Sequence, residues 1–404
     1  MWCIVSNRVL VVLFLTLLGA LSASAQSIEA RFSTEKTDYL VGEPIFVTLA
    51  VSNKTSEAIW LDFKGTGFPF PCNDFDIEVP GAAFASDGGC GGEAASCFRG
   101  FREVQPLKTI LIRRLVDASF RIRQPGQYEV RVHAIVSVHH QNLFDSPEAE
   151  KVDLSQSLAV RARGGTEQQL KEAFQPYVEA LNSSDDMIRG DAAHAITELA
   201  PTFLEDVLIK LAKSHYAYGA IIALRKVNTS ATRAALAEIA TRGEDPSVRI
   251  EAIQNLGRTN DTSYLPSLFK LMESEDKEIQ YVAAAAAGNV GGRPAVNRLL
   301  ALVSNPDAKT RSAGANGLGQ TRAREAVPIL IELLLDSDVE VRQNAVSSLF
   351  LLTHYAAFDG NGWADISTAE SAAAVHQRWV NWWSSHGTSC EMHGMADCAS
   401  PKPL

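Results

Sequence analysis

The sequence has 404 residues, yet it lacks a second long apolar run, an excess of positive charge and the common catalytic signatures. Beyond residue 25, no apolar stretch reaches the about 20 residues that a membrane-spanning helix needs. A net charge of −10 disfavours binding to nucleic acid or to anionic lipid. The chain contains no G-x-S-x-G, no G-x-G-x-x-G and no P-loop. We therefore expect a protein that is not an enzyme, needs no cofactor and binds no nucleic acid.

The one long apolar run lies at the amino terminus. Arg8 precedes the apolar residues 9–21, and the small residues 22–25 form an A-x-A-like cleavage site before Gln26. This order is typical of a secretory signal peptide, which is removed from the mature chain. We predict a signal peptide over residues 1–25, a mature protein without a membrane span, and a periplasmic or secreted location.

Cysteine is scarce and is absent from the middle of the chain. Five cysteines follow the predicted signal peptide, and in an exported protein they are disulfide candidates first. Because five is an odd number, one thiol is free or pairs between chains. The sequence does not fix the pairing. The candidates are Cys72, Cys90, Cys97, Cys390 and Cys398.

Residues 27–163 carry the alternating, β-branched runs that are typical of strands. Such runs occupy residues 44–51, 109–116 and 128–136, with turn residues between them and no helical pattern. Several strands at this spacing indicate an all-β sandwich. The Gly-rich residues 81–100 depart from the pattern and read as a long loop that at least one disulfide pins.

Two motifs in this region resemble bacterial Ig-like modules. They are Gly42-Glu43-Pro44 with the alternating strand after it, and the later Pro125-Gly126-x-Tyr128 turn, which is similar to the tyrosine corner of that class. The resemblance implies an Ig-like β-sandwich over 27–163. In such a corner, the Tyr128 hydroxyl would be anchored to backbone.

After the Gly164-Gly165-Thr166 linker, the period changes and a repeat begins. The pattern D-x-x-[VI]-R-x-x-A recurs, so that the Arg position is occupied by Arg249, Gln280, Arg311 and Arg342, each 31 residues apart. An earlier copy surrounds Arg189, and a degenerate copy fits near Ala220-x-x-x-Leu224. A constant period of this length indicates an all-α solenoid of about six units over 167–353.

The repeated positions have simple physical roles. The Asp of each copy is expected to cap the second helix of its unit. The Val or Ile position, which holds Ile188 in the first copy, is expected to be buried, and small Ala or Gly residues let neighbouring helices approach. The Arg is expected to bond to that Asp in its own or the neighbouring unit.

These units resemble the short HEAT-like repeats that are named after phycobiliprotein lyases. The resemblance implies a curved helical scaffold that is used for protein–protein contact. Some HEAT-like proteins are di-iron hydroxylases that use His-Glu pairs, but this sequence contains no His-Glu dipeptide. The bilin-lyase activity does not suit an exported chain.

Residues 354–404 are different again. A helix is expected over 369–384, with Trp379, Trp382 and Trp383 capping the last repeat. The cluster after it has spacing that zinc accepts, although a disulfide between the two cysteines explains it better. Its members are His386, Cys390, His393 and Cys398. A second weak metal candidate is His133, His139 and His140 with Asp145, for which a solvated surface hairpin is the simpler explanation.

The helical wheel leaves one surface of the second helices to consider. The residues one and five places after the Arg position should lie away from the core, on the concave face. In the second to fourth units these positions are aromatic, aliphatic or amide, where solvated charge is usual. The alternative is that the helical wheel is rotated and that these residues belong to the core. The predicted partner-binding residues are Tyr218, Ile222, Ile250, Gln254 and Tyr281.

The sequence thus predicts a two-domain exported scaffold, an Ig-like sandwich followed by a HEAT-like solenoid, that binds a protein or peptide. Two other functions stay open. One is a metal-dependent enzyme or metal-binding protein that uses the tail cluster. The other is a cell-surface adhesin that binds glycans through the β domain.

Overall fold

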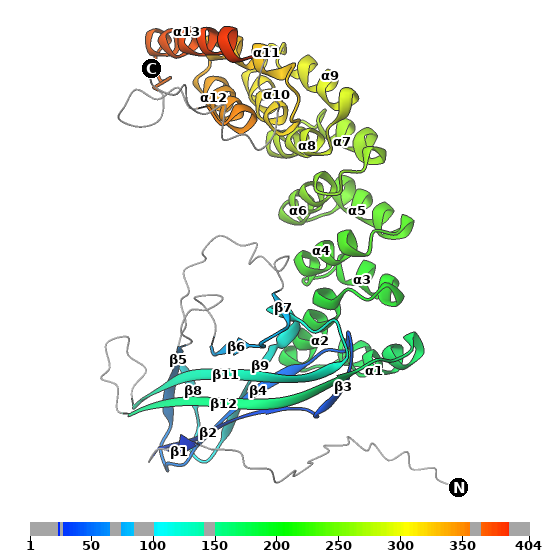
Figure 1. Cartoon of the computed structure of the whole chain (residues 1–404), viewed down its shortest axis with the longest axis vertical. Helices are drawn as coiled ribbons and strands as arrows, with labels where there is room; N and C mark the ends of the chain where they lie inside the picture. Colours follow the sequence, from blue (N-terminus) through cyan, green and yellow to red (C-terminus); the bar gives the residue numbers. More distant parts are fainter. Residues whose placement is uncertain are drawn as a thin grey trace. The chain divides into compact units, whose positions relative to one another are not determined.

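The computed structural model divides the chain into two compact units, Met1–Leu199 and Ala200–Leu404 (Figure 1). Unit 1 holds the strands and the first helical pair, and unit 2 holds the remaining helices. The model describes residues 23–24, 27–64, 74–84, 101–140, 150–355 and 365–387.

Unit 1 contains two main β-sheets that enclose one core. Their facing side chains alternate with exposed ones along each strand, as in Val47, Leu49 and Val51 of β4. The first sheet has the order β1 (Ala23–Ser24), β2 (Ile28–Thr34), β4 (Phe46–Asn53) and β9 (Thr109–Leu115). The second has the order β3 (Asp38–Leu40), β12 (Glu150–Arg163), β11 (Gly126–His139), β5 (Ile59–Lys64) and β8 (Arg102–Val104), with β6 (Asp76–Glu78) also on β11.

The described strand pairs are antiparallel, except that β12 and β3 are parallel. A small separate ribbon joins β7 (Ala83–Phe84) to β10 (Phe120–Arg121). The three strand runs predicted from the sequence are confirmed as β4, β9 and β11. The Tyr128 hydroxyl donates a hydrogen bond of 2.9 Å to the Gln124 carbonyl oxygen, so this tyrosine is anchored to backbone as expected.

The first helical pair packs on the sheets of unit 1. It consists of α1 (Glu167–Ala180) and α2 (Asp186–Leu199). Phe46 of β4, Leu115 of β9 and Ala195 of α2 form a small buried cluster, and Tyr177 of α1 stacks on the Phe46 ring at 6.1 Å. An ion pair of 2.9 Å joins Arg113 to Asp191. These contacts bind the first helical pair to the outer face of the β4–β9 pair.

Unit 2 is a two-layered helical array that ends in a capping helix (Figure 1). The first helices of its units are α3 (Glu205–Leu211), α5 (Ser230–Arg242), α7 (Leu265–Leu271), α9 (Gly292–Leu302) and α11 (Ala326–Glu332). The second helices are α4 (Ala217–Val227), α6 (Pro246–Gly257), α8 (Lys277–Val290), α10 (Ala308–Gln320) and α12 (Val339–Thr353). Together with the α1–α2 pair, they make the six units that the repeat predicted. Helix α13 (Ala369–His386) follows.

The repeated aspartates cap the second helices, as the sequence predicted. Asp245 accepts backbone N–H bonds from Ser247 and Val248 at 2.8 and 3.4 Å. Asp185, Asp276 and Asp338 accept two backbone N–H bonds in the same way, whereas Asp307 accepts one, from Thr310. These bonds satisfy amide groups that a helix start leaves unpaired. The capping residues are Asp185, Asp245, Asp276, Asp307 and Asp338.

The expected burial at the Val or Ile position holds for Ile279 and Val341, is only partial for Val248 and is wrong for the first copy. Ile279 and Val341 are fully buried, whereas Ile188 is 44% exposed, next to the exposed Met187. The periodicity gave Ile188 a role in the core because it reports the position in the helix and not whether a neighbouring helix covers it.

Candidate functional site: the second-helix strip

The five predicted binding residues lie on the non-core side of their helices. Tyr218 of α4 is 49% exposed. The other four, Ile222, Ile250, Gln254 and Tyr281, are half-buried. Fully buried residues of the same helices include Ala220, Ile221, Leu224, Ile253, Leu256 and Ala284, of which Ile221, Ile253 and Ala284 directly flank the predicted residues. We call the five predicted residues the second-helix strip.

The second helices form the more tightly spaced layer of unit 2. Gly288 packs directly against the backbone of Gly317, and a Cβ atom on Gly257 would lie only 2.7 Å from the Cα atom of Ala286. Neighbouring first helices meet at far fewer points. Because close spacing in one of two layers curves an array towards that layer, the second helices line its inner side.

Hydrogen bonds hold one end of the strip. The Tyr281 hydroxyl donates to Asn344 Oδ1 at 2.9 Å, and the Asn344 amide donates to Ser312 Oγ at 2.7 Å. Burial raises the pKa of Tyr281, and Glu340 adds to the rise. By contrast, the exposed Tyr218 makes no side-chain hydrogen bond to the part of the chain that the structure describes. Tyr281 is fixed, and Tyr218 is available to a partner.

A buried amide fixes the spacing between the first two helices of the strip. Asn255 is fully buried; its Oδ1 accepts from Arg225 Nε at 2.9 Å, and its amide donates to Glu251. Arg225 belongs to α4 and the other two residues belong to α6. This contact positions Tyr218 and Ile222 relative to Ile250.

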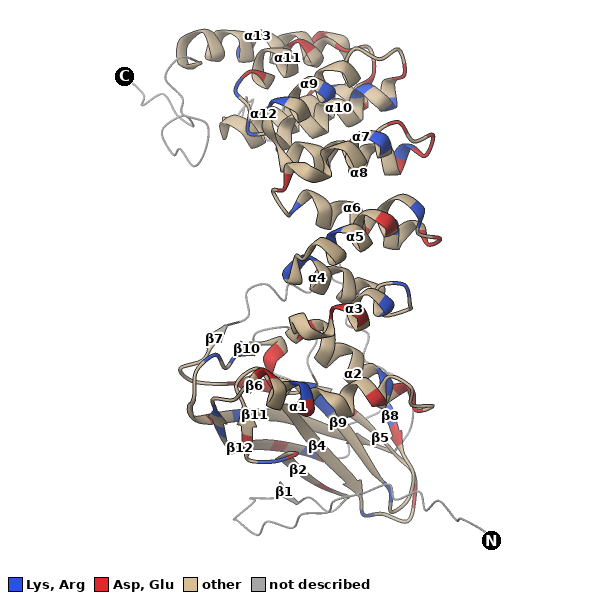
Figure 2. Ribbon diagram, turned by 90° about the vertical axis from the view of Figure 1, so that its right-hand side faces the viewer, with Lys and Arg blue, Asp and Glu red and all other residues tan. Residues whose placement is uncertain are grey.

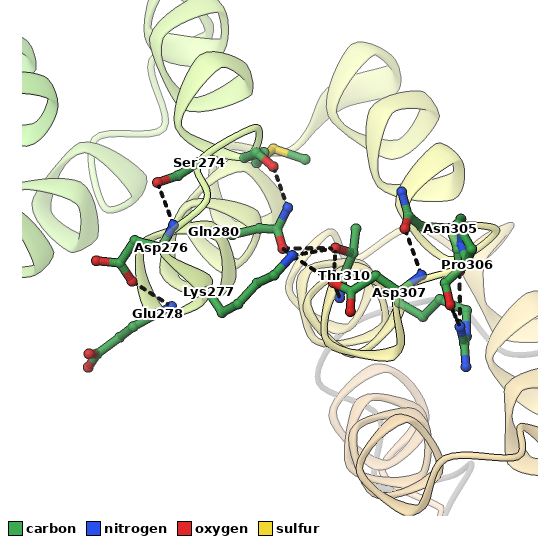
Figure 3. A network of polar contacts seen from close by, with 11 residues as sticks. Ser274, Asp276, Lys277, Glu278, Gln280, Asn305, Pro306, Asp307 and Thr310 are labelled. Atoms are coloured by element: carbon green, nitrogen blue, oxygen red, sulfur yellow. Dashed lines mark hydrogen bonds and ion pairs between the residues drawn. The ribbon is translucent and has the colours of Figure 1, made fainter.

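A polar ladder joins the fourth unit to the fifth (Figure 3). Lys277 Nζ lies 2.6 Å from Asp307 Oδ2 and 3.2 Å from Thr310 Oγ1. Thr310 Oγ1 lies 2.7 Å from Asp307 Oδ2 and 3.0 Å from Gln280 Oε1, and the Gln280 amide donates to the Met272 carbonyl at 2.8 Å. The hydrogen bond from Lys277, then that from Thr310, lowers the pKa of Asp307 to about 2. The ladder keeps this aspartate ionised and ties two units together.

The predicted bond between each Arg and a capping Asp is wrong. Arg311 bonds the carbonyl oxygens of Asn305 and Pro306 in the turn before its own helix, at 3.0 and 2.9 Å. It also forms a bidentate pair with Asp336, at 2.8 Å for both bonds. Asp336 lies in the next turn and caps no helix. The aspartates that cap helices already accept backbone N–H groups, so Arg311 bonds to other acceptors.

The charged residues gather at the turns. In α8 and α10 they are confined to the first turn, and Figure 2 shows the remainder of both helices in tan. The middle of the second-helix face therefore presents apolar and amide groups, and a partner that binds there need not displace ion pairs.

Sequence reasoning missed a cleft of about 570 Å³ in unit 2. It lies between the turn before α4 and the turn before α6, and Lys213, His215, Ala217 and Arg242 line it together with further residues of both turns. In the degenerate second copy, Ala217 stands where the other copies have a long Arg or Gln side chain, and Lys213 stands where they have Asp. That loss of the repeat consensus was the available signal.

The histidine candidates on the β domain do not converge. His133 Nε2 lies 2.9 Å from Asp153 Oδ1, and its Nδ1 lies 3.7 Å from Asp76 Oδ2. His139 is buried and packs on Phe101 with ring centroids 4.7 Å apart. His140 is exposed, and Asp145 lies outside the described residues.

In the tail, the structure describes only one member of the metal candidate. His386 Nδ1 lies 3.0 Å from the Trp382 carbonyl oxygen, and its ring stacks on the Trp382 indole at 5.4 Å. Cys390, His393 and Cys398 lie outside the described residues, as do Cys72, Cys90 and Cys97. Across the described ranges, no three His, Cys, Asp or Glu side chains are placed to hold a metal ion.

One family model matches part of the helical array of unit 2. Residues 233–313 and 296–358 match the family model for HEAT repeats. These residues are therefore similar to HEAT repeats. The matched residues run from α5 to the end of α12 and include Ile250, Gln254 and Tyr281 of the strip. HEAT repeats are consistent with a scaffold for protein interaction, and their matched units contain the ladder of Figure 3.

Solved structures with similar helical arrays share little sequence with this chain. An engineered protein is 23% identical over 44% of this chain and 95% of its own, with a TM-score of 0.30. The CpcE–CpcF complex of phycocyanin lyase from Nostoc is 20% identical over 43% and 75%, with a TM-score of 0.31. Human deoxyhypusine hydroxylase is 14% identical over 53% and 97%, with a TM-score of 0.25. We draw no functional argument from these likenesses.

No curated protein sequence matches the chain. Among the described helices, none is both long and apolar enough to cross a membrane.

Proposed function

We propose that the protein is an exported, non-enzymatic scaffold whose second-helix strip binds a protein or peptide. One observation carries the proposal: Tyr218, 49% exposed and without a hydrogen bond to the described part of the chain, continues into the half-buried Ile222 and Ile250. Exposed aromatic and aliphatic groups that adjoin on a rigid support are typical of binding sites. The packed helical array supplies such a support, and its part from residue 233 to residue 358 is similar to HEAT repeats.

We also propose that the protein has no enzymatic role. The strip offers phenol, aliphatic and amide groups, none of which is a nucleophile placed beside a general base. The carboxylates nearest to it act in structural contacts, since Glu251 accepts from Asn255, and Ser312 donates to Glu340 at 3.2 Å. Binding is the function that these groups support.

Export is proposed from residues 1–25. A fusion of this segment to a periplasmic reporter enzyme should direct the reporter out of the cytoplasm, and the mature chain should begin at Gln26 by amino-terminal sequencing. A full-length chain that stays in the cytoplasm with Met1 intact would contradict this part of the proposal.

Binding is tested by comparing two variants of equal exposure. Tyr218→Ala removes the most exposed side chain of the strip, and Leu335→Ala removes a side chain that is also 49% exposed but lies outside the strip. Proteins that co-purify from the native organism are quantified by mass spectrometry. We expect an at least tenfold loss of a specific partner with Tyr218→Ala and no loss with Leu335→Ala. Equal recovery with both variants would contradict the proposal.

The two other functions make different predictions for the same purified protein. If the tail cluster binds metal, chelator-free protein contains stoichiometric zinc, and Cys390 and Cys398 are unoxidised. If unit 1 is an adhesin, the β domain binds glycans and Tyr218→Ala leaves that binding unchanged. Neither result is expected from the scaffold that we propose.

A further inference from the structure

One strand at the end of a sheet in unit 1 has an unpaired side. The first sheet has the order β1–β2–β4–β9, and within the described residues β9 pairs only with β4. A sheet edge of this kind presents backbone N–H and C=O groups that can pair with another strand.

The register identifies which backbone groups face outward. Asn53 N–H donates to the Lys108 carbonyl at 2.9 Å, and Val116 N–H donates to the Ile45 carbonyl at 2.8 Å. Both pairs belong to the antiparallel ladder between β4 and β9. Because directly opposed residues alternate between bonded and non-bonded pairs, the even-numbered residues of β9 bond to β4. The N–H and C=O groups of Thr109, Leu111 and Arg113 therefore point to the free side.

Two exposed leucines lie on or next to this edge. Leu111, at the centre of the three outward residues, is 48% exposed. Leu107, in the turn before the strand, is 76% exposed and has a φ of 59°. Ile112, by contrast, is 4% exposed and faces the core between the sheets. Charged side chains commonly protect edge strands, and here Lys108, Arg113 and Arg114 flank the exposed Leu111.

We propose that β9 pairs with the β9 strand of a second copy of the chain, antiparallel about a two-fold axis at Leu111. In this register the two Leu111 side chains meet on the exposed face of the joined sheet, and Thr109 lies opposite Arg113 of the second copy. A two-fold interface needs a self-complementary surface, and an outward strand with leucine at its centre provides one. The two four-stranded sheets would become one continuous sheet.

The basic residues of β9 do not oppose this pairing. Arg113 is ion-paired with Asp191 at 2.9 Å and with Glu35, and its guanidinium lies over the Phe46 ring at 4.4 Å. Arg114, which would lie opposite Lys108 of the second copy, donates to the Phe75 carbonyl on the core side. Both guanidinium groups are held by their own chain and are turned away from the free edge.

The first test is the mass of the mature full-length chain in solution, by sedimentation at concentrations from 1 to 100 µM. We expect the dimer for the natural sequence. With Leu111→Asp, which sets two carboxylates at the axis, we expect an at least tenfold weaker association and an unchanged far-ultraviolet dichroism spectrum. A monomer for the natural sequence at every concentration, or a dimer that Leu111→Asp does not weaken, would overturn the proposal.

The second test fixes the register by cysteine cross-linking, with the linked peptide identified by mass spectrometry. Directly opposed bonded residues have Cα atoms about 5.5 Å apart, which suits a disulfide. Leu111→Cys should therefore give a 111–111 linked peptide under mild oxidation. Thr109→Cys is the matched control, because its two copies would lie about 14 Å apart along the strands and should not link. A 109–109 link without a 111–111 link would overturn the proposed axis.

Discussion

At the scale of single residues, each second helix is followed within three residues by a residue with a positive φ. Asn228 and Gly291 suit that conformation, whereas Arg322, with a φ of 60°, does not. A side chain in this region costs roughly 1–2 kcal/mol. These positions recur once in each unit, but the sequence repeat did not predict them. They are Ala200, Asn228, Asn260, Gly291, Arg322 and His354.

We predict that Arg322→Gly stabilises the protein by about 1 kcal/mol, because glycine removes the steric cost of the positive φ. The measurement is the free energy of unfolding in urea. The control is Arg258→Gly, at the end of α6, where φ is −82° and the substitution should be neutral or destabilising by up to about 1 kcal/mol. A gain in the control that matches the gain at 322 would contradict this explanation.

A buried carboxyl in unit 1 makes stability depend on pH. Asp117 is 3% exposed, and burial raises its pKa from 3.8 to about 7, although the Ile45 N–H bond and Arg121 act in the opposite direction. The folded chain therefore keeps a proton that the unfolded chain releases. This contribution to stability is complete below pH 3.8 and is lost as the pH rises to about 7.

We predict that Asp117→Asn makes the free energy of unfolding less dependent on pH between about 4 and 7. The asparagine keeps an oxygen acceptor for the Ile45 N–H and cannot ionise. Urea unfolding at several pH values gives the slope for both proteins. An identical slope in the variant would show that other groups cause the pH dependence.

At the scale of helices, stability depends on close backbone packing between second helices. Gly288 of α8 lies against the Gly317 carbonyl of α10, and a methyl group there would clash with backbone. We predict that Gly288→Ala destabilises the protein by about 1–3 kcal/mol, since the backbone must move. Gly190→Ala in α2 is the control. Nothing lies within 4 Å of the added methyl, so the usual helix preference should give a gain of about 0.5–1 kcal/mol. Urea unfolding measures both, and equal effects would contradict the packing argument.

The capping helix depends on one buried arginine. Arg342 of α12 is 5% exposed and donates to the carbonyl oxygens of Ile366 and Ser367, at 2.8 and 2.9 Å, just before α13. We predict that Arg342→Met, which keeps an unbranched apolar stem but none of the donors, speeds hydrogen exchange in 369–387 at least tenfold. Exchange in α5 and α6 is the internal control. Unchanged exchange in 369–387 would show that the Trp379 and Trp382 contacts hold α13 alone.

Local chemistry explains which elements could be predicted. The aspartate caps and the strand alternation depend on neighbours in the sequence, so a single chain reveals them. The packing of Tyr177 on Phe46, the Arg311–Asp336 pair and the exposure of Ile188 depend on which elements meet in space. Periodicity carries no information on those meetings. The helical period fixes the angular position of each side chain round its helix, so it could indicate the residues of the strip. The cleft at Ala217 was missed because only the loss of the repeat consensus at that copy marks it.

At the scale of the whole molecule, we propose that the β unit pairs through β9 and that the second-helix strip of the helical array binds a partner. The two proposals are tested independently. Leu111→Asp is expected to weaken the association of copies, and Tyr218→Ala is expected to weaken partner binding. Loss of the partner with Leu111→Asp alone would instead indicate that two strips must bind together.

The central claim is that the second-helix strip binds a protein or peptide, and photo-crosslinking in living cells tests it most directly. A photoreactive amino acid replaces Tyr218 on α4 in one strain and Ile329, 37% exposed on the first helix α11, in another. The account predicts a discrete cross-linked partner from position 218 and none from position 329. A partner from position 329 alone, or from neither position, would contradict it.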